Sequence, residues 1–180
     1  MSHMPRKDFY FLGFVIAMFF YMVATAITKH LELSHFDLGV EIFICACLSI
    51  IYPEPGSGLG WGWRSIRVML LFTAFLCATW TAGFWLWTSH SSSFDWGWKI
   101  VFPLLGLVVV TPWFEEKIVR HLLLYSVAEW IGPIASSVIV SILFAIAHKS
   151  VMVMAFIVSL ALCWMRFRFK AKTAHCVVVH

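Results

Sequence analysis

Long apolar runs alternate with short polar links along most of the chain. The first run, residues 9–28, contains no charged residue. Its length matches that of a helix that crosses the hydrocarbon core of a bilayer, which needs about 20 residues. Arg6 and Lys7 precede it, and basic residues favour the cytoplasmic side of a membrane. The pattern therefore predicts a first spanning helix that runs from the inside to the outside.

Further apolar runs have the same character and are separated by polar residues, proline or glycine. Pro53 and the glycines that follow it end the second run, because neither residue type continues a helix well. We expect an all-α, polytopic transmembrane bundle of about six to seven hydrophobic helices. The later runs cover residues 38–52, 68–88, 100–114, 130–147 and 150–165.

The segment 114–129 decides on which side of the membrane the later helices begin and end. If it crosses as a separate span, the basic cluster at residues 166–172 falls outside, against the positive-inside rule. If it lies in the interface or re-enters, the cluster falls inside. We expect the second arrangement, with the fourth helix ending at Phe114.

The composition places most of the chain in lipid. Hydrophobic residues make up 62% of the sequence, charged residues 12%, and the mean hydropathy is +0.89, outside the range of soluble domains. The net charge of +4 comes from basic residues that flank the apolar runs. We interpret them as membrane anchors and expect no nucleic-acid partner. The prediction is a multi-pass protein in contact with membrane lipids, in a bacterial cytoplasmic membrane.

Ionisable side chains gather inside an apolar region between residues 113 and 121. Ionisable groups in such places are costly and often functional. Glu116 and Arg120 are four apart, so on a helix they share a face and can form an ion pair. Glu115 lies about 100° around the helix from Glu116 and is left available as a general base. The alternative is that both glutamates are interfacial, with Lys117 and Arg120 as their partners.

Histidines supply the other candidate groups. His148 closes an uncharged apolar run, and His175 and His180 flank the last apolar stretch. An imidazole could position a water molecule, share its proton, or stabilise an oxyanion. The competing interpretations are an interfacial histidine at position 148 and a frayed C-terminal end.

Three motifs resemble those of a known family in order and spacing. They are Glu115-Glu116-x-x-x-Arg120, then Phe144-x-x-x-His148, then a late histidine in an apolar segment. This set is similar to the successive motifs of the CAAX prenyl protease and bacteriocin-processing (CPBP, or Abi) intramembrane endopeptidases. The resemblance implies an N-terminal flank at 1–8, N-terminal transmembrane helices at 9–98, and a CAAX-protease-like core at 99–180.

The resemblance also implies roles for these residues. Glu115 and His148 would activate the water that cleaves a peptide bond, and Arg120 would brace Glu116. The late family motif is HxxxN or HxxxD, but His175 is followed four residues later by Val179. We therefore prefer His180 as the late histidine, whose amide partner would fall past the last residue of this sequence.

We expect no metal or other cofactor. The alternative is a zinc ion held by Glu115, His148 and His180, with water as the fourth ligand. The sequence has no HExxH motif, so the metal-free glutamate mechanism takes precedence.

The predicted function is an intramembrane endopeptidase that hydrolyses a peptide bond in a membrane-anchored protein or peptide. One alternative is a non-catalytic membrane scaffold or immunity protein of the same fold. Another is a transporter or channel, which usually carries matching broken helices in two halves, and the sequence shows no such symmetry.

Overall fold

The computed structural model describes residues 6–31, 36–54, 59–87 and 106–180. Within these ranges every regular element is a helix and none is a strand, which confirms the all-α fold class. Two of the described helices, Lys7–His30 and Lys149–Phe169, are long and apolar enough to cross a membrane. The larger number of spanning helices stays a prediction.

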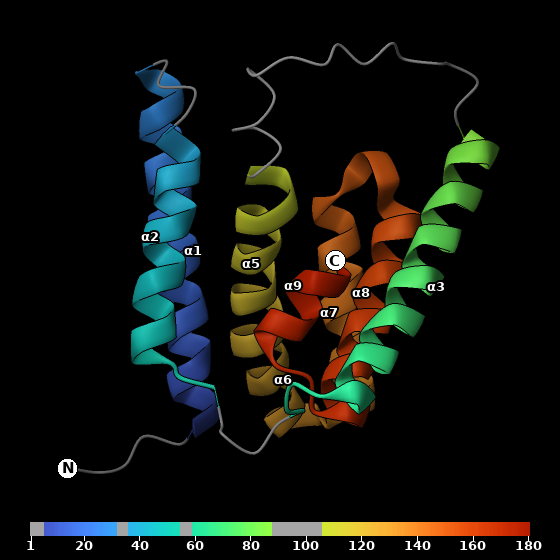
Figure 1. Ribbon diagram of the computed structural model, residues 1–180. Helices are drawn as coiled ribbons and strands as arrows, with labels where there is room; N and C mark the ends of the chain where they lie inside the picture. The colour runs from blue at the N-terminus through green and yellow to red at the C-terminus, as the bar shows by residue number, and fades with distance from the viewer. Residues whose placement is uncertain (1–5, 32–35, 55–58, 88–105) are drawn as a thin grey trace.

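Helices α1 (Arg6–His30) and α2 (Phe36–Ile51) form an antiparallel pair at one side of the molecule (Figure 1). Hydroxyl groups inside them bond back to the preceding turn: Thr25 donates to the carbonyl of Tyr21 at 2.8 Å, and Ser49 to that of Cys45 at 2.7 Å. Such bonds satisfy a polar side chain where water is scarce. After α2 the amide of Tyr52 still donates to Leu48, but Pro53 has no N–H to continue the helix.

After α3 (Trp63–Trp87), a helix runs without interruption from Gly106 to Ile131 in the described residues. Its parts are η2 (Gly106–Val110), α5 (Thr111–Glu115), η3 (Glu116–Leu123) and α6 (Leu124–Ile131), where η2 and η3 have π-helical geometry. The expected end of the fourth helix at Phe114 is wrong, because the helix continues through Glu115 and beyond. This helix lies along α1, with Ser126 donating to the carbonyl of Lys7 at 2.8 Å and Phe114 packed on Tyr21. The wider π turns accommodate Pro112, which lacks an N–H for the helical ladder.

Gly132 ends this helix and reverses the chain. Its φ of 84° lies in the left-handed region that glycine adopts without strain, and Pro133 opens the next helix. Helices α7 (Pro133–Ala147) and α8 (Met152–Phe169) then form a hairpin through the short η4 (Lys149–Val151).

Basic residues gather at one end of the bundle. The end of α8 returns to the end of the molecule at which α1 and α3 (Trp63–Trp87) begin (Figure 1). The basic cluster therefore lies on the side expected from the positive-inside rule, but it does so because the helix 106–131 crosses the bundle as one element. The basic residues at this end are Arg6, Lys7, Arg64, Arg67, Arg168, Lys170 and Lys172.

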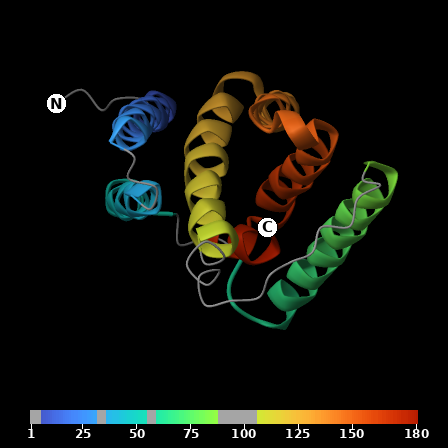
Figure 2. The same cartoon turned by 90° about the horizontal axis from the view of Figure 1, so that it is seen from above.

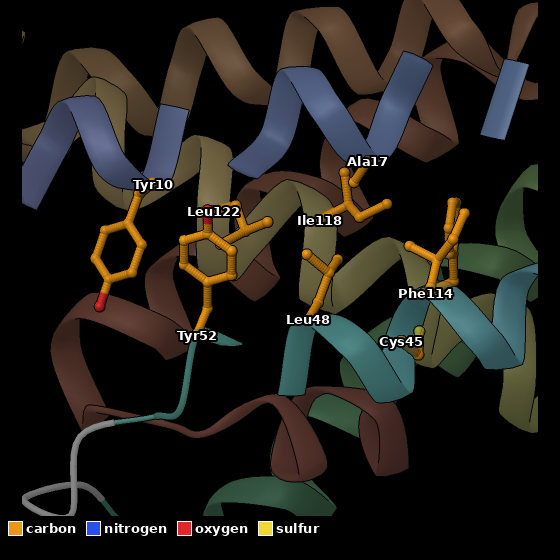
Figure 3. Close-up of a cluster of buried hydrophobic side chains, with 9 residues drawn as sticks. Tyr10, Ala17, Cys45, Leu48, Tyr52, Phe114, Ile118 and Leu122 are labelled. Carbon is orange, nitrogen blue, oxygen red and sulfur yellow. The ribbon is translucent and has the colours of Figure 1, made fainter. Parts of the chain in front are cut away.

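Seen from above, the α1–α2 pair, the helix 106–131, the α7–α8 hairpin and α3 follow one another (Figure 2), and α9 (Thr173–Val179) turns back among them. The core beside α1 consists of aromatic and aliphatic side chains from α1, α2 and the helix 106–131 (Figure 3). Large apolar side chains also cover the outside: Ile50 is 81% exposed and Ile134 is 82% exposed. Such a surface suits lipid as the surrounding solvent.

We expect Gly13→Ala to destabilise the protein, whereas Gly39→Ala should not. A Cβ at Gly13 would lie 2.4 Å from the Tyr52 ring, which is held between Phe9 and Tyr10, while a Cβ at Gly39 meets nothing within 4 Å. Overpacking a core costs about 1–3 kcal/mol. Thermal unfolding in detergent should show a lower midpoint for Gly13→Ala alone. Equal midpoints for both variants would contradict this packing.

Candidate active site

A buried ion pair lies beneath the site. Nη1 of Arg120 is 3.3 Å from Oε1 of Glu116, and neither side chain is exposed. The guanidinium also lies over the Phe144 ring, 4.2 Å from its centroid, so the arginine is held from both sides. The structure thus contains the pair that the four-residue spacing predicts.

His148 reaches Glu115 from the end of α7. Its Nε2 lies 3.4 Å from Oε1 of Glu115, and its Nδ1 lies 2.8 Å from the carbonyl oxygen of Phe144. A carbonyl oxygen only accepts hydrogen bonds, so Nδ1 carries a proton and donates it. In the neutral imidazole the lone pair of Nε2 therefore faces the Glu115 carboxylate.

His180 follows α9 and contacts both glutamates. Its Nε2 lies 3.6 Å from Oε2 of Glu115, and its Nδ1 lies 3.3 Å from Oε1 of Glu116. Both contacts are ion pairs when the imidazole is protonated. A proton on Nδ1 suits Glu116, because a carboxylate can only accept.

His175 lies outside this cluster. Its ring stacks on Trp61 with 4.6 Å between centroids, and its Nδ1 accepts the amide of Lys172 at 3.2 Å. Burial, followed by the nearby charge of Lys172, lowers the pKa of His175, which favours the neutral ring that this acceptor role needs. The structure therefore places His180, and not His175, beside the two glutamates.

All five side chains singled out from the sequence converge in one place. The Glu115 carboxylate lies between two imidazole nitrogens. In a neutral imidazole such a nitrogen can accept a hydrogen bond, so a water molecule or a shared proton can link the carboxylate to the rings. The side chain of His148 is 35% exposed, and those of Glu115 and His180 are each 19% exposed, above the closed pair of Glu116 and Arg120. The arrangement can hold a water, remove its proton and keep the supporting charges dry.

Lys117 does not pair with either glutamate, contrary to the alternative interpretation of the motif. It is buried, and its Nζ donates to the carbonyl of Tyr52 at 2.8 Å. A cation at this carbonyl also interacts favourably with the C-terminal end of the α2 dipole. Lys117 therefore joins α2 to the helix that carries the two glutamates.

Sequence reasoning assigned no role to Glu41, although it is a buried acid next to the site. Its carboxylate accepts the hydroxyl of Thr111 at 2.9 Å and that of Tyr21 at 3.3 Å. Thr111 precedes Glu115 by one helical turn, so this polar contact joins α1 and α2 to the site. A lone acidic residue in an apolar run was the only sequence signal for it.

Glu54 and Arg166 were also missed. Arg166 was expected to be one of the exposed basic anchors, which is wrong: its side chain is 2% exposed and its Nη2 lies 2.9 Å from Oε1 of Glu54. Burial alone would raise the pKa of Glu54, but the charge of Arg166 and hydrogen bonds from Thr173 outweigh it and lower the value to about 2. Glu54 is therefore ionised throughout the neutral range.

The zinc alternative meets a geometric obstacle. Two imidazoles and a carboxylate are the right chemical types for a catalytic zinc. Across the described ranges, however, no group of three or more His, Cys, Asp or Glu side chains is arranged to hold a metal ion.

We expect any hydrolytic activity of this site to survive exhaustive chelation, because the Glu115 carboxylate can accept a proton from water without a metal. The measurement is the cleavage rate of purified protein before and after dialysis against a chelator, with the metal content determined in parallel. Loss of activity that one divalent metal restores stoichiometrically would reinstate the zinc site.

The fold and this cluster together define a helical membrane protein with a hydrolase-like site. Residues 96–180, which include the whole cluster, match the family model described as Type II CAAX prenyl endopeptidase Rce1-like. This part of the chain is therefore similar to the CAAX-protease family, and the predicted family resemblance is confirmed. Neither the curated proteins nor the solved structures contain a significant match.

Proposed function

We propose that the protein is an intramembrane endopeptidase in which Glu115 activates the attacking water. One observation carries this proposal: the Glu115 carboxylate lies 3.4 Å from Nε2 of His148 and 3.6 Å from Nε2 of His180, inside the part of the chain that matches the family model. A carboxylate that only supports the fold has no need of two imidazoles beside it. A base that must hold a water molecule and remove its proton needs such neighbours.

The reaction uses only the side chains of the cluster and one water. The water donates a hydrogen bond to Glu115, and as its oxygen bonds to the peptide carbonyl carbon, its proton passes to the carboxylate. The carbonyl oxygen becomes an oxyanion. The C–N bond then breaks as the leaving nitrogen takes the proton from Glu115, giving a carboxylic acid and an amine. General acid–base catalysis of this kind contributes about 10²- to 10⁴-fold.

The histidines have distinct roles in this scheme. His148, with its Nδ1 fixed by the Phe144 carbonyl, shares the water with Glu115. His180, when it carries a second proton on Nε2, donates to the oxyanion. Glu116, which is paired with Arg120, lies 3.3 Å from Nδ1 of His180 and orients this ring by its charge when the imidazole is protonated.

The substrate is a protein or peptide that reaches the site through the membrane. The apolar exterior keeps the protein in lipid, so chains that carry a lipid or a hydrophobic helix are concentrated beside it. The family description makes a prenylated C-terminal peptide a suitable first probe. We propose a multi-pass location in a bacterial cytoplasmic membrane.

The test compares the full chain with its Glu115→Gln variant, each reconstituted in liposomes. The probes are a farnesylated peptide ending in a CAAX sequence and the same peptide without the lipid. In parallel, mass spectrometry identifies new N-termini among the membrane proteins of cells that make each form. The proposal expects cleavage products with the wild type alone. If neither form gives cleavage products, the protein is a non-catalytic member of its family. If both forms give the same products, Glu115 is not the base.

A further inference from the structure

Glu54 makes long-range contacts from the segment that follows α2. Its Oε1 lies 2.9 Å from Nη2 of Arg166, near the end of α8. The amide of Thr173 donates to Oε1 at 2.9 Å and to Oε2 at 3.1 Å, and the Thr173 hydroxyl donates to the same carboxylate. One carboxylate thus ties the end of α8 to the start of α9.

Arg166 is the third member of this group of contacts. We call Glu54, Arg166 and Thr173 together the clasp. Nη1 of Arg166 donates to the carbonyl of Ala171 at 3.0 Å and to the Thr173 hydroxyl at 3.4 Å. Because the Arg166 side chain is buried, the Glu54 charge compensates a cation that water cannot reach. A backbone bond from Leu59 to the carbonyl of Lys170, at 2.8 Å, holds the same two segments together.

The clasp lies at one end of α9 and the candidate site at the other. α9 has 7 residues, too few for a helix to be stable by itself, so its position depends on what holds its ends. Thr173 begins it in the clasp, and His180 follows it against Glu115 and Glu116. A helix of this length spans about 10 Å at 1.5 Å per residue, so a displacement at Thr173 is transmitted directly to His180.

We propose that Glu54 is a positioning residue that holds α9 where His180 meets the two glutamates. Glu54 lies outside residues 96–180, so the family domain depends on the N-terminal part of the chain to complete its site. This inference rests on the proposed function, since it assigns Glu54 a part in the same reaction.

The first test is kinetic and uses the full chain in liposomes. Glu54→Gln removes the charge and one acceptor oxygen, and it should lower kcat by about 10- to 100-fold with KM little changed, since a small misplacement of a catalytic group has an effect of this order. In a His180→Ala background the same substitution should lower kcat no further. The matched control is Glu129→Gln, which changes an exposed glutamate and should leave kcat unchanged.

The second test does not require activity. Diethyl pyrocarbonate modifies accessible imidazoles, and mass spectrometry of the C-terminal peptide gives the rate for His180. Glu54→Gln should raise that rate several-fold at an unchanged folded fraction, and Glu129→Gln should not. An unchanged His180 rate, or an equal loss of kcat in the wild-type and His180→Ala backgrounds, overturns the positioning role. Absence of cleavage by the wild type would instead reject the proposed function, while the modification rate would still test the clasp.

Discussion

Glu115→Gln is expected to lower kcat for peptide cleavage by about 10²- to 10⁴-fold, the usual contribution of a general base. The amide has almost the same shape as the carboxylate but cannot take a proton from water. The Glu115 side chain is 19% exposed and the buried pair beneath it is untouched, so the fold should persist. Initial rates in liposomes and the thermal unfolding midpoint measure the two effects separately.

The exposed Glu129 supplies the control, because Glu129→Gln makes the same chemical change away from the site. It should leave both the rate and the unfolding midpoint unchanged. If Glu115→Gln retains the wild-type rate, Glu115 has no part in the mechanism.

Arg120→Ala is expected to destabilise the protein by about 3–5 kcal/mol, the usual cost of removing one partner of a buried ion pair. Glu116 is fully buried and would lose the guanidinium that compensates its charge from 3.3 Å away. The Phe144 ring would also lose the group packed on its face. Yield of folded protein and the midpoint of thermal unfolding in detergent measure this effect.

Two variants separate the ion pair from a general effect of losing an arginine. Arg64→Ala changes an exposed residue and should have little effect. Adding Glu116→Gln to Arg120→Ala removes the uncompensated charge and should recover part of the stability. Wild-type stability for Arg120→Ala alone would show that the pair does not support the fold.

The sequence predicted most of the described helices because apolar runs and polar links differ sharply in composition. It did not show that the fourth apolar run and the charged segment after it form one helix, of which residues 106–131 are described. The helix continues because each of these charges has a partner: Arg120 pairs with Glu116, and Lys117 donates to the Tyr52 carbonyl. A hydropathy pattern cannot show such partners when they come from distant parts of the chain.

The candidate site was predictable as far as it depends on local spacing. The four-residue intervals between Glu116 and Arg120, and between Phe144 and His148, place each pair on one helix face. The clasp was not predictable, because Glu54 and Arg166 meet only through the tertiary packing of α8 and α9. For the same reason the sequence alone could not distinguish Arg166 from the basic residues that follow it.

The central claim is that Glu115 and His148 act together on one water, and a double-mutant cycle tests it most directly. The rates of Glu115→Gln, His148→Ala and the double variant are measured with the same substrate in the same liposomes. Side chains that act as a unit have non-additive effects, so the double variant should be about as slow as the slower single variant. If the two losses multiply, or if either single variant keeps the wild-type rate, the two residues do not share the reaction.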